Sequence, residues 1–268
     1  MSLSVAEVSP PRPAPELRRE GLHHIGNSTH WIVLEGVAIL TDPWVAEPAD
    51  GVLLHRRPPQ PLPTDPDVVL VSHGHGDHFD PAALALLRRD ATLLLPAGEL
   101  CQRAAALGFR DVRGVSPGEH LAHVRGLSVD VVRGLHSVPE VCYRVERNGR
   151  AFFFGGDTML TPEIEALAAA KPVPLAILPA ERSTLLGRRF VMVPREAVAL
   201  AQRFRAQRAV LTHHEQRLVD RWYVRLILRI PTLEGAELPD WFQVPAPGDF
   251  IAFPWDGATV PAGAGVSS

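Results

Sequence analysis

The segment VVLVSHGHGDHFDP, residues 68–81, restricts what this chain can fold into more than any other stretch. It begins as a continuous apolar run without alternation, which is typical of a strand buried on both faces. Histidines and an aspartate crowd the next positions. Asp80-Pro81 then supply a capping carboxylate and a first-turn proline for a helix over 79–90. The segment therefore predicts a buried strand that ends in a polar turn and continues into a helix.

The polar turn has the spacing of a metal site. His73 and His75 are two residues apart, so in an extended segment both imidazoles project to the same side and can bind one cation. The two glycines between the polar residues lack the Cβ atoms that would prevent the turn from curling tightly. Asp77 and His78 follow directly and can point to a neighbouring position. Imidazole and carboxylate together suit zinc, iron or manganese rather than calcium. An incidental polar loop is the alternative interpretation.

The rest of the chain alternates strands and helices in two similar sets. Strands over 30–36 and 37–43, interrupted by Glu35-Gly36, are predicted to form a hairpin that closes at Asp42-Pro43. Asn148-Gly149 favours a tight turn within 141–158. A strand and a helix share 91–109; helices over 161–171 and 193–207 alternate with strands over 175–180 and 208–215. This organisation predicts an α/β fold with two sheets face to face and helices outside, a four-layer αβ/βα sandwich.

Composition narrows the class of function. The formal net charge of −3 gives no basic field of the kind that nucleic-acid binders carry, so no nucleic-acid partner is expected. The two cysteines, Cys101 and Cys142, indicate neither a disulfide framework nor a thiolate-rich zinc site. We expect a small-molecule substrate. The sequence leaves the oligomeric state open, with a homo-oligomer as one of the options.

Domain organisation and location follow from the same pattern. Residues 1–18 are rich in proline and predict a flexible tail, and residues 19–268 are predicted to form a single domain. The chain has no apolar signal region and no apolar run of membrane-spanning length. We therefore expect a cytoplasmic protein without a membrane span.

Six adjacent positions cannot enclose two metal ions, so further ligands must come from other strand ends. Three later residues qualify: His136 ends LSVDVVRGLH, Asp157 ends AFFFGGD, and His213 ends AVLTH. His214 competes with His213, because adjacent residues on a strand point in opposite directions. At this point the choice between these two histidines is open.

These residues resemble the metallo-β-lactamase superfamily. The run His73-x-His75-x-Asp77-His78 matches its His-x-His-x-Asp-His signature, and the three later residues match its remaining ligand positions in order and spacing. The segments HHIGNSTHWIVLEGVAILTDPW and LPAERS…VPREAVALAQRF…AVLTHHE resemble the branch that contains L-ascorbate 6-phosphate lactonase and N-acyl phosphatidylethanolamine phospholipase D. The resemblance spans about residues 21 to 215, and the segment of about 216–268 diverges from the family pattern.

The resemblance implies two divalent metal ions, with Zn²⁺ favoured and Mn²⁺ or Fe as alternatives. His73, His75 and His136 would hold the first ion; Asp77, His78 and His213 would hold the second, with Asp157 bridging them. The family pattern places the last ligand directly after a short apolar run, which favours His213 over His214. Asp77 would also be catalytic, by orienting the attacking water or taking up a proton. By position alone, candidates for hydrogen bonds to the imidazoles are Asp42, Ser72 and Thr158.

The resemblance also implies hydrolysis of an ester-like bond, a lactone or a phosphodiester. Arg182, Arg188 and His214 are candidate substrate-binding residues, since arginine suits phosphate or carboxylate; solvated surface arginines are the alternative. The alternative functions are a di-iron oxidoreductase of the same fold and a non-catalytic member of a biosynthetic complex. The aromatic residues near the end of the chain could line a pocket, cover an interface or complete the core, which is the favoured interpretation: Trp222, Tyr223, Trp241, Phe242 and Trp255.

Overall fold

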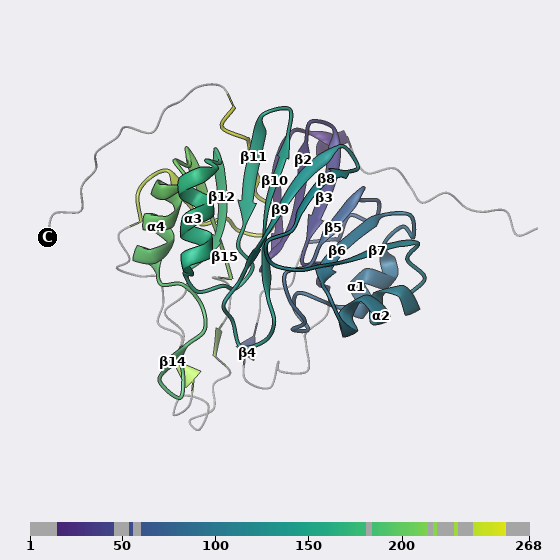
Figure 1. Ribbon diagram of the computed structural model, residues 1–268, viewed down its shortest axis with the longest axis horizontal. Helices are drawn as coiled ribbons and strands as arrows, with labels where there is room; N and C mark the ends of the chain where they lie inside the picture. Colours follow the sequence, from purple (N-terminus) through teal and green to yellow (C-terminus); the bar gives the residue numbers. More distant parts are fainter. Residues whose placement is uncertain are drawn as a thin grey trace, which may run out of the picture.

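Two mixed β-sheets pack face to face and carry helices on their outer faces (Figure 1). The computed structural model describes residues 15–45, 54–55, 60–180, 184–213, 217–218, 228–229 and 238–255. A single-turn 3-10 helix, η1 (Pro15–Arg18), precedes the first strand. The predicted tail, residues 1–18, lies mostly outside the described residues.

The first sheet has the strand order β19-β1-β2-β3-β5-β6-β7. Antiparallel pairing joins β19, β1, β2 and β3, whereas β3, β5, β6 and β7 are parallel. The strands are β1 (Gly21–Gly26), β2 (Thr29–Leu34), β3 (Val37–Thr41), β5 (Val68–Leu70), β6 (Thr92–Pro96), β7 (Asp111–Val115) and β19 (Phe250–Ile251).

The second sheet repeats this plan with the order β18-β15-β12-β11-β10-β9-β8. Here β8 to β11 are antiparallel, and β11, β12, β15 and β18 are parallel. The strands are β8 (His120–Val124), β9 (Leu127–Arg133), β10 (Val141–Arg147), β11 (Arg150–Phe154), β12 (Leu175–Pro179), β15 (Arg208–Thr212) and β18 (Phe242–Gln243).

Two smaller sheets lie outside this sandwich. β13 (Thr184–Leu185) pairs with β14 (Arg188–Arg189) and with β17 (Leu228–Arg229). β4 (Leu54–His55) pairs with β16 (Arg217–Leu218). Figure 1 shows β14 well away from the helices α1 and α2, on a projection at the lower end of the molecule.

The helices lie in two pairs on opposite sides of the molecule. Those over the first sheet are α1 (Pro81–Leu86) and α2 (Glu99–Ala106); those over the second are α3 (Pro162–Ala170) and α4 (Pro194–Arg203). One apolar cluster, which includes Ile32 and Phe154, fills the space between the sheets. Two further clusters join each sheet to its own helices, through Leu84 on one side and Ile164 on the other. These layers confirm the predicted four-layer αβ/βα sandwich.

Local sequence signals explain several of the observed boundaries. The Asp80 side chain accepts a hydrogen bond from the Ala82 N–H at 2.8 Å, so it caps α1 as predicted. The helix ends at Leu86, earlier than the predicted 79–90. The next residue, Leu87, has an extended backbone conformation with ψ 154°, so the helix cannot continue through it.

The first hairpin reverses at the predicted interruption between its two strands. β2 and β3 join at Glu35-Gly36, where both residues have positive φ, 51° and 77°. Such a two-residue turn matches the twist of the flanking strands. Asp42, which was expected to close the hairpin, instead follows β3 and is fully buried. The prediction of a closing turn at Asp42-Pro43 was therefore wrong.

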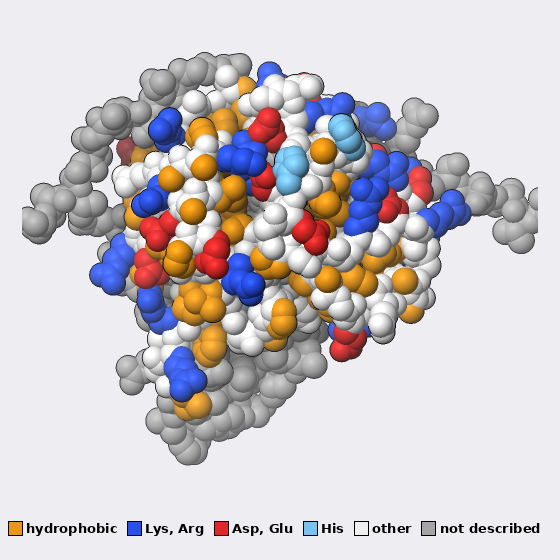
Figure 2. All heavy atoms as spheres, viewed as in Figure 1, with side chains coloured by type: hydrophobic (Ala, Val, Ile, Leu, Met, Phe, Trp, Pro, Cys, Tyr) orange, Lys and Arg blue, Asp and Glu red, His pale blue; other side chains and the backbone are white. Residues whose placement is uncertain are grey.

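The aromatic residues that are described near the end of the chain belong to the core. Trp241 and Phe242 pack with the cluster beneath α3 and α4, and Trp255 packs against the cluster between the sheets. Trp222 and Tyr223 lie outside the described residues. Acidic and basic side chains are interspersed on the face shown in Figure 2. In the described part of the chain no helix is long and apolar enough to cross a bilayer.

Candidate metal centre

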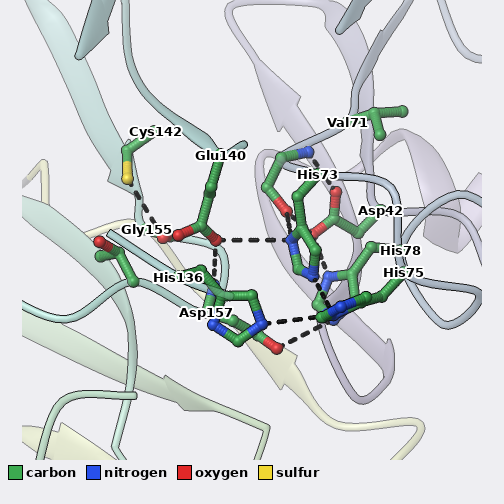
Figure 3. Close-up of polar contacts among 12 residues, drawn as sticks. Asp42, Val71, His73, His75, His78, His136, Glu140, Cys142, Gly155 and Asp157 are labelled. Atoms are coloured by element: carbon green, nitrogen blue, oxygen red, sulfur yellow. Dashed lines mark hydrogen bonds and ion pairs between the residues drawn. The ribbon is translucent and has the colours of Figure 1, made fainter. Parts of the chain in front are cut away.

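The predicted metal ligands come together where four strands of the two main sheets end. β5 leads to His73, β9 to His136, β11 to Asp157 and β15 to His213. Figure 3 shows His73, His75, His78, His136 and Asp157 pointing toward one another across the space between the sheets. The strand ends therefore deliver ligands from both halves of the molecule to one point.

Three histidines form the first group of donor atoms. His73 Nε2 lies 3.0 Å from His75 Nδ1, and His136 Nε2 lies 3.3 Å from the same atom. The donor atoms of all three lie within 4.8 Å of one another. Nitrogens this close, all able to present lone pairs, suit one cation with an open position. His75 and His136 are partly exposed, so this side of the centre faces the solvent.

The second group consists of Asp77, His78 and His213, which are all buried. Asp77 Oδ2 lies 3.4 Å from His78 Nε2 and 3.7 Å from His213 Nε2. His213 has a φ of 62°, which is rare for a residue with a Cβ atom, and sits at the end of β15. Held in this conformation, it places Nε2 within 3.0 Å of Asp157. His214 lies outside the described residues.

Asp157 connects the two groups. Its Oδ2 lies 3.2 Å from His78 Nε2, and His73, His78 and Asp157 form a third set of donors that overlaps both others. Asp157 Oδ1 is buried and forms no hydrogen bond with the described residues. An unpaired buried polar atom costs free energy. A cation beside this oxygen would satisfy it, so the residues present fit the metal ions that the sequence predicts.

A carboxylate behind the centre orients two of the imidazoles. Asp42 Oδ2 lies 2.6 Å from His78 Nδ1 and accepts a hydrogen bond from the Ser72 hydroxyl at 2.7 Å. Ser72 Oγ in turn lies 2.9 Å from His73 Nδ1. These contacts engage the Nδ1 atoms and leave the Nε2 atoms directed at the centre. They agree with the predicted role of Asp42 and Ser72.

Thr158 does not play the role that its position suggested. Its hydroxyl accepts a hydrogen bond from the Leu135 N–H at 2.8 Å and donates one to the Met159 carbonyl at 2.7 Å. It therefore holds the backbone beside His136 rather than an imidazole. The expectation was wrong because sequence position alone does not show which way a residue at a strand end points.

Three further partners escaped the sequence reasoning. Asn27 donates a hydrogen bond to Asp77 Oδ2 at 2.9 Å, and the Phe190 carbonyl lies 2.9 Å from His136 Nδ1. The Glu140 carboxyl lies 3.5 Å from His73 Nδ1. The sequence does hold one signal for Asn27, because an asparagine in the turn GNS suits the positive φ of 52° that the structure gives it.

Electrostatics favour a cation at this position. Burial lowers the pKa of His73 well below its ordinary value, and His78 adds to the effect. Burial would also lower the pKa of His78, but the carboxylates of Asp157, Asp77 and Asp42 outweigh it and raise that pKa well above the ordinary range. Burial disfavours the charged form of Asp157, yet His213 and His78 hold its pKa well below the usual value. A neutral His73 and an ionised Asp157 are the forms that bind metal.

The candidate substrate-binding residues are placed only in part. Arg188 lies in β14 and is exposed. Arg182 lies outside the described residues. The backbone of Phe190, two residues after Arg188, contacts His136, so β14 leads directly to the centre.

A family model for the beta-lactamase superfamily domain matches residues 38–214. The chain belongs to this superfamily. The superfamily match includes the ligand signature and ends just after His213. The chain is also 26% identical over 202 residues to a UPF0173 metal-dependent hydrolase of Methanopyrus kandleri. The aligned region covers 71% of this chain and 82% of the relative.

Solved structures share the fold at lower identity. An isothiocyanate hydrolase from Delia radicum gut bacteria is similar with a TM-score of 0.67 and 20% identity, over 87% of this chain and 98% of that chain. CmlA, a diiron β-hydroxylase from Streptomyces venezuelae, has a TM-score of 0.60 and 17% identity, over 76% of this chain and 46% of that chain. The family model confirms the predicted superfamily, whereas these solved structures show the fold. The narrower resemblance to the lactonase and phospholipase branch stays a prediction.

Proposed function

We propose that this chain is a metal-dependent hydrolase with a dinuclear centre that cleaves an ester-like bond, a lactone or a phosphodiester. One observation carries the proposal: the group of His73, His78 and Asp157 shares His73 with one of the other two donor groups and His78 with the other, so the seven predicted ligands form one continuous cluster. The curated relative of Methanopyrus kandleri, a metal-dependent hydrolase, supports the same reaction class.

The ligands divide between two positions. His73, His75 and His136 would hold one ion, and Asp77, His78 and His213 the other, with Asp157 between them. Zn²⁺ suits this nitrogen and carboxylate set, as do Mn²⁺ and Fe. Bound there, two cations would lower the pKa of a shared water and polarise the bond that is attacked.

The chain's own residues would direct that water. Asp77 presents Oδ2 toward His78 and His213, and the Asn27 amide donates to this same oxygen. The carboxylate is therefore held in one orientation, which suits a group that orients a water molecule for attack. In this proposal the open side by His75 and His136 admits the substrate, and the exposed Arg188 on β14 binds an anionic group of that substrate.

The proposal is tested on the purified full chain by metal analysis and turnover. We expect bound metal, and hydrolysis of bis(p-nitrophenyl) phosphate or of a γ-lactone after loading with Zn²⁺ or Mn²⁺. His75→Ala removes a nitrogen that faces both His73 and His136, so it should reduce turnover to background. The matched control is His123→Ala on β8, an exposed histidine outside the centre, which should keep wild-type turnover. Hydrolysis above background by the His75→Ala variant would contradict the proposal.

Oxidation by a di-iron centre is a second candidate. Mixed imidazole and carboxylate ligands also suit iron, and the fold is similar to that of a diiron β-hydroxylase. The discriminating experiment loads the chain with Fe²⁺ without oxygen and then follows oxygen uptake with an added reductant. Sustained uptake that needs His75, together with no hydrolysis by the Zn²⁺ form, would favour this candidate. Bound metal without either activity would favour a non-catalytic member of the family.

A further inference from the structure

A buried acid lies directly behind the candidate metal centre. Glu140 immediately precedes β10, and its side chain has no exposed surface. Among the described residues no lysine or arginine forms an ion pair with it. Burial, reinforced by the charge of Asp157, raises the pKa of Glu140 well above its ordinary value. Burying a carboxyl group without a cation is costly, so the position contributes little to stability by itself.

The carboxyl group contacts two of the predicted ligands. Glu140 Oε1 accepts a hydrogen bond from the Asp157 N–H at 2.7 Å and lies 3.5 Å from His73 Nδ1 (Figure 3). The next residue, Val141, donates its N–H to the Ser72 carbonyl at 3.0 Å. Glu140 thus reaches from the second sheet to the ligand turn of the first.

Two glycines shape the space around this side chain. A Cβ atom at Gly134 would come within 2.6 Å of Glu140 Oε2, and one at Gly156 within 2.6 Å of Oε1. Real Cβ atoms do not approach so closely. Gly156 also has a φ of +59° and directly precedes Asp157. The backbone therefore leaves room for this carboxyl group at the point where it meets the bridging ligand.

We infer that Glu140 is a positioning residue that holds Asp157 and His73 in the arrangement needed to bind metal. The inference rests on the proposed metal centre. Through the Asp157 N–H, Glu140 fixes the backbone that carries the bridging carboxylate between His78 and His213. Glu140 Oε1 also joins Ser72 Oγ as an oxygen acceptor facing His73 Nδ1, which leaves His73 Nε2 for the ion.

The test compares metal binding by three Glu140 variants. Glu140→Gln keeps the length of the side chain and an oxygen acceptor, so it should bind metal almost as tightly as the wild type. Glu140→Ala removes the acceptor, and Glu140→Asp shortens it by one methylene. Both should weaken binding by about 10- to 100-fold, the usual effect of losing a partner of a metal ligand. Glu146→Gln is the matched control, because Glu146 lies on β10, the strand that follows Glu140, but pairs with Arg144.

Titration of the metal-free full chain with Co²⁺, followed by its visible absorption, gives the affinity and reports ligand geometry without any turnover. We expect the Ala and Asp variants to show both a weaker dissociation constant and an altered absorption spectrum, and the Gln variant to restore both. If Glu140→Ala fails to fold, the Co²⁺ affinity and absorption spectrum of Glu140→Asp, compared with those of Glu140→Gln, test the inference. Wild-type affinity in Glu140→Asp, or equal losses in the Gln and Asp variants, would overturn the inference. Normal Co²⁺ binding without hydrolysis would instead overturn the proposed function and leave this inference standing.

Discussion

Replacing Asp42 with asparagine tests how the protein presents its imidazoles to metal. The Asp42 carboxylate accepts hydrogen bonds from the Ser72 N–H and the Ser72 hydroxyl, both at 2.7 Å, and lies 2.6 Å from His78 Nδ1. Each of these neighbours can donate a hydrogen bond to the Asp42 carboxylate. Asparagine has nearly the same shape but brings an NH₂ group in place of one oxygen.

Either orientation of the new amide creates a conflict. If the NH₂ group replaces Oδ2, it faces His78 Nδ1 and the Ser72 hydroxyl, so His78 must accept there and carry its proton on Nε2, the atom that faces the centre. If the NH₂ group replaces Oδ1, it faces the Ser72 N–H, and a buried donor is left unpaired. An unpaired buried group costs about 1–3 kcal/mol. At about 1.4 kcal/mol per factor of ten, metal affinity should fall about 5- to 150-fold.

The assay measures Zn²⁺ affinity by calorimetric competition with a chelator, alongside turnover at low and at saturating metal. Asp42→Asn should show weak binding of at least one ion, and excess metal should restore part of the turnover. Asp67→Asn is the matched control, because Asp67 accepts the Ala38 N–H at 2.9 Å from the other end of β5. It should leave metal affinity unchanged. Wild-type affinity for both ions in Asp42→Asn would refute the reasoning.

Two further substitutions probe other contacts. Asn27→Ala removes the hydrogen bond to Asp77 Oδ2, and hydrogen bonds to charged groups are worth about 1.5–3 kcal/mol. The kcat/KM of the metal-saturated enzyme should therefore fall at least about tenfold. An unchanged kcat/KM would contradict the role given to Asp77. Burial disfavours the charged form of Asp130, but the neighbouring Lys171 and His120 outweigh it and lower its pKa. Ionised Asp130 therefore stabilises the folded state at pH values above its pKa in the unfolded chain, about 3.9. This stabilisation disappears as the pH falls through the lower pKa that Asp130 has in the folded protein. Asp130→Asn should lower the free energy of unfolding by about 1 kcal/mol at pH 7, measured in urea, and by almost nothing at about pH 2; a difference that persists at the lower pH would refute this sign.

Sequence periodicity predicted the layers because the inner strands of each main sheet, such as β5, β6 and β12, are buried on both faces. The runs that became β5 and β6 read as continuous apolar segments, and the structure places them between an inner and an outer apolar cluster. The helix boundaries were less predictable. The residues after Leu86 lack a glycine or proline stop signal, and what ends α1 there is the extended conformation of Leu87.

The candidate ligands could be identified from the sequence because metal binding requires particular residue types at particular spacings. The residues that support them carry no such signature. Glu140 lies 17 positions before Asp157, and Asn27 lies 50 positions before Asp77. Each becomes a neighbour of the centre only through the pairing of strands within each sheet and the packing of the two sheets against each other. A sequence pattern therefore predicts the atoms that would touch metal, whereas the fold determines what holds those atoms in place.

The symmetry of the two sheets explains why one histidine is so strongly held. In each sheet the pairing changes from antiparallel to parallel at one strand, β3 in the first and β11 in the second. Asp42 follows β3 directly, and Asp157 follows β11 after two glycines. These two aspartates, from corresponding positions, approach opposite nitrogens of His78: Asp42 at Nδ1 and Asp157 at Nε2. The same topological position thus supplies one carboxylate that orients the imidazole and another that shares its predicted metal ion.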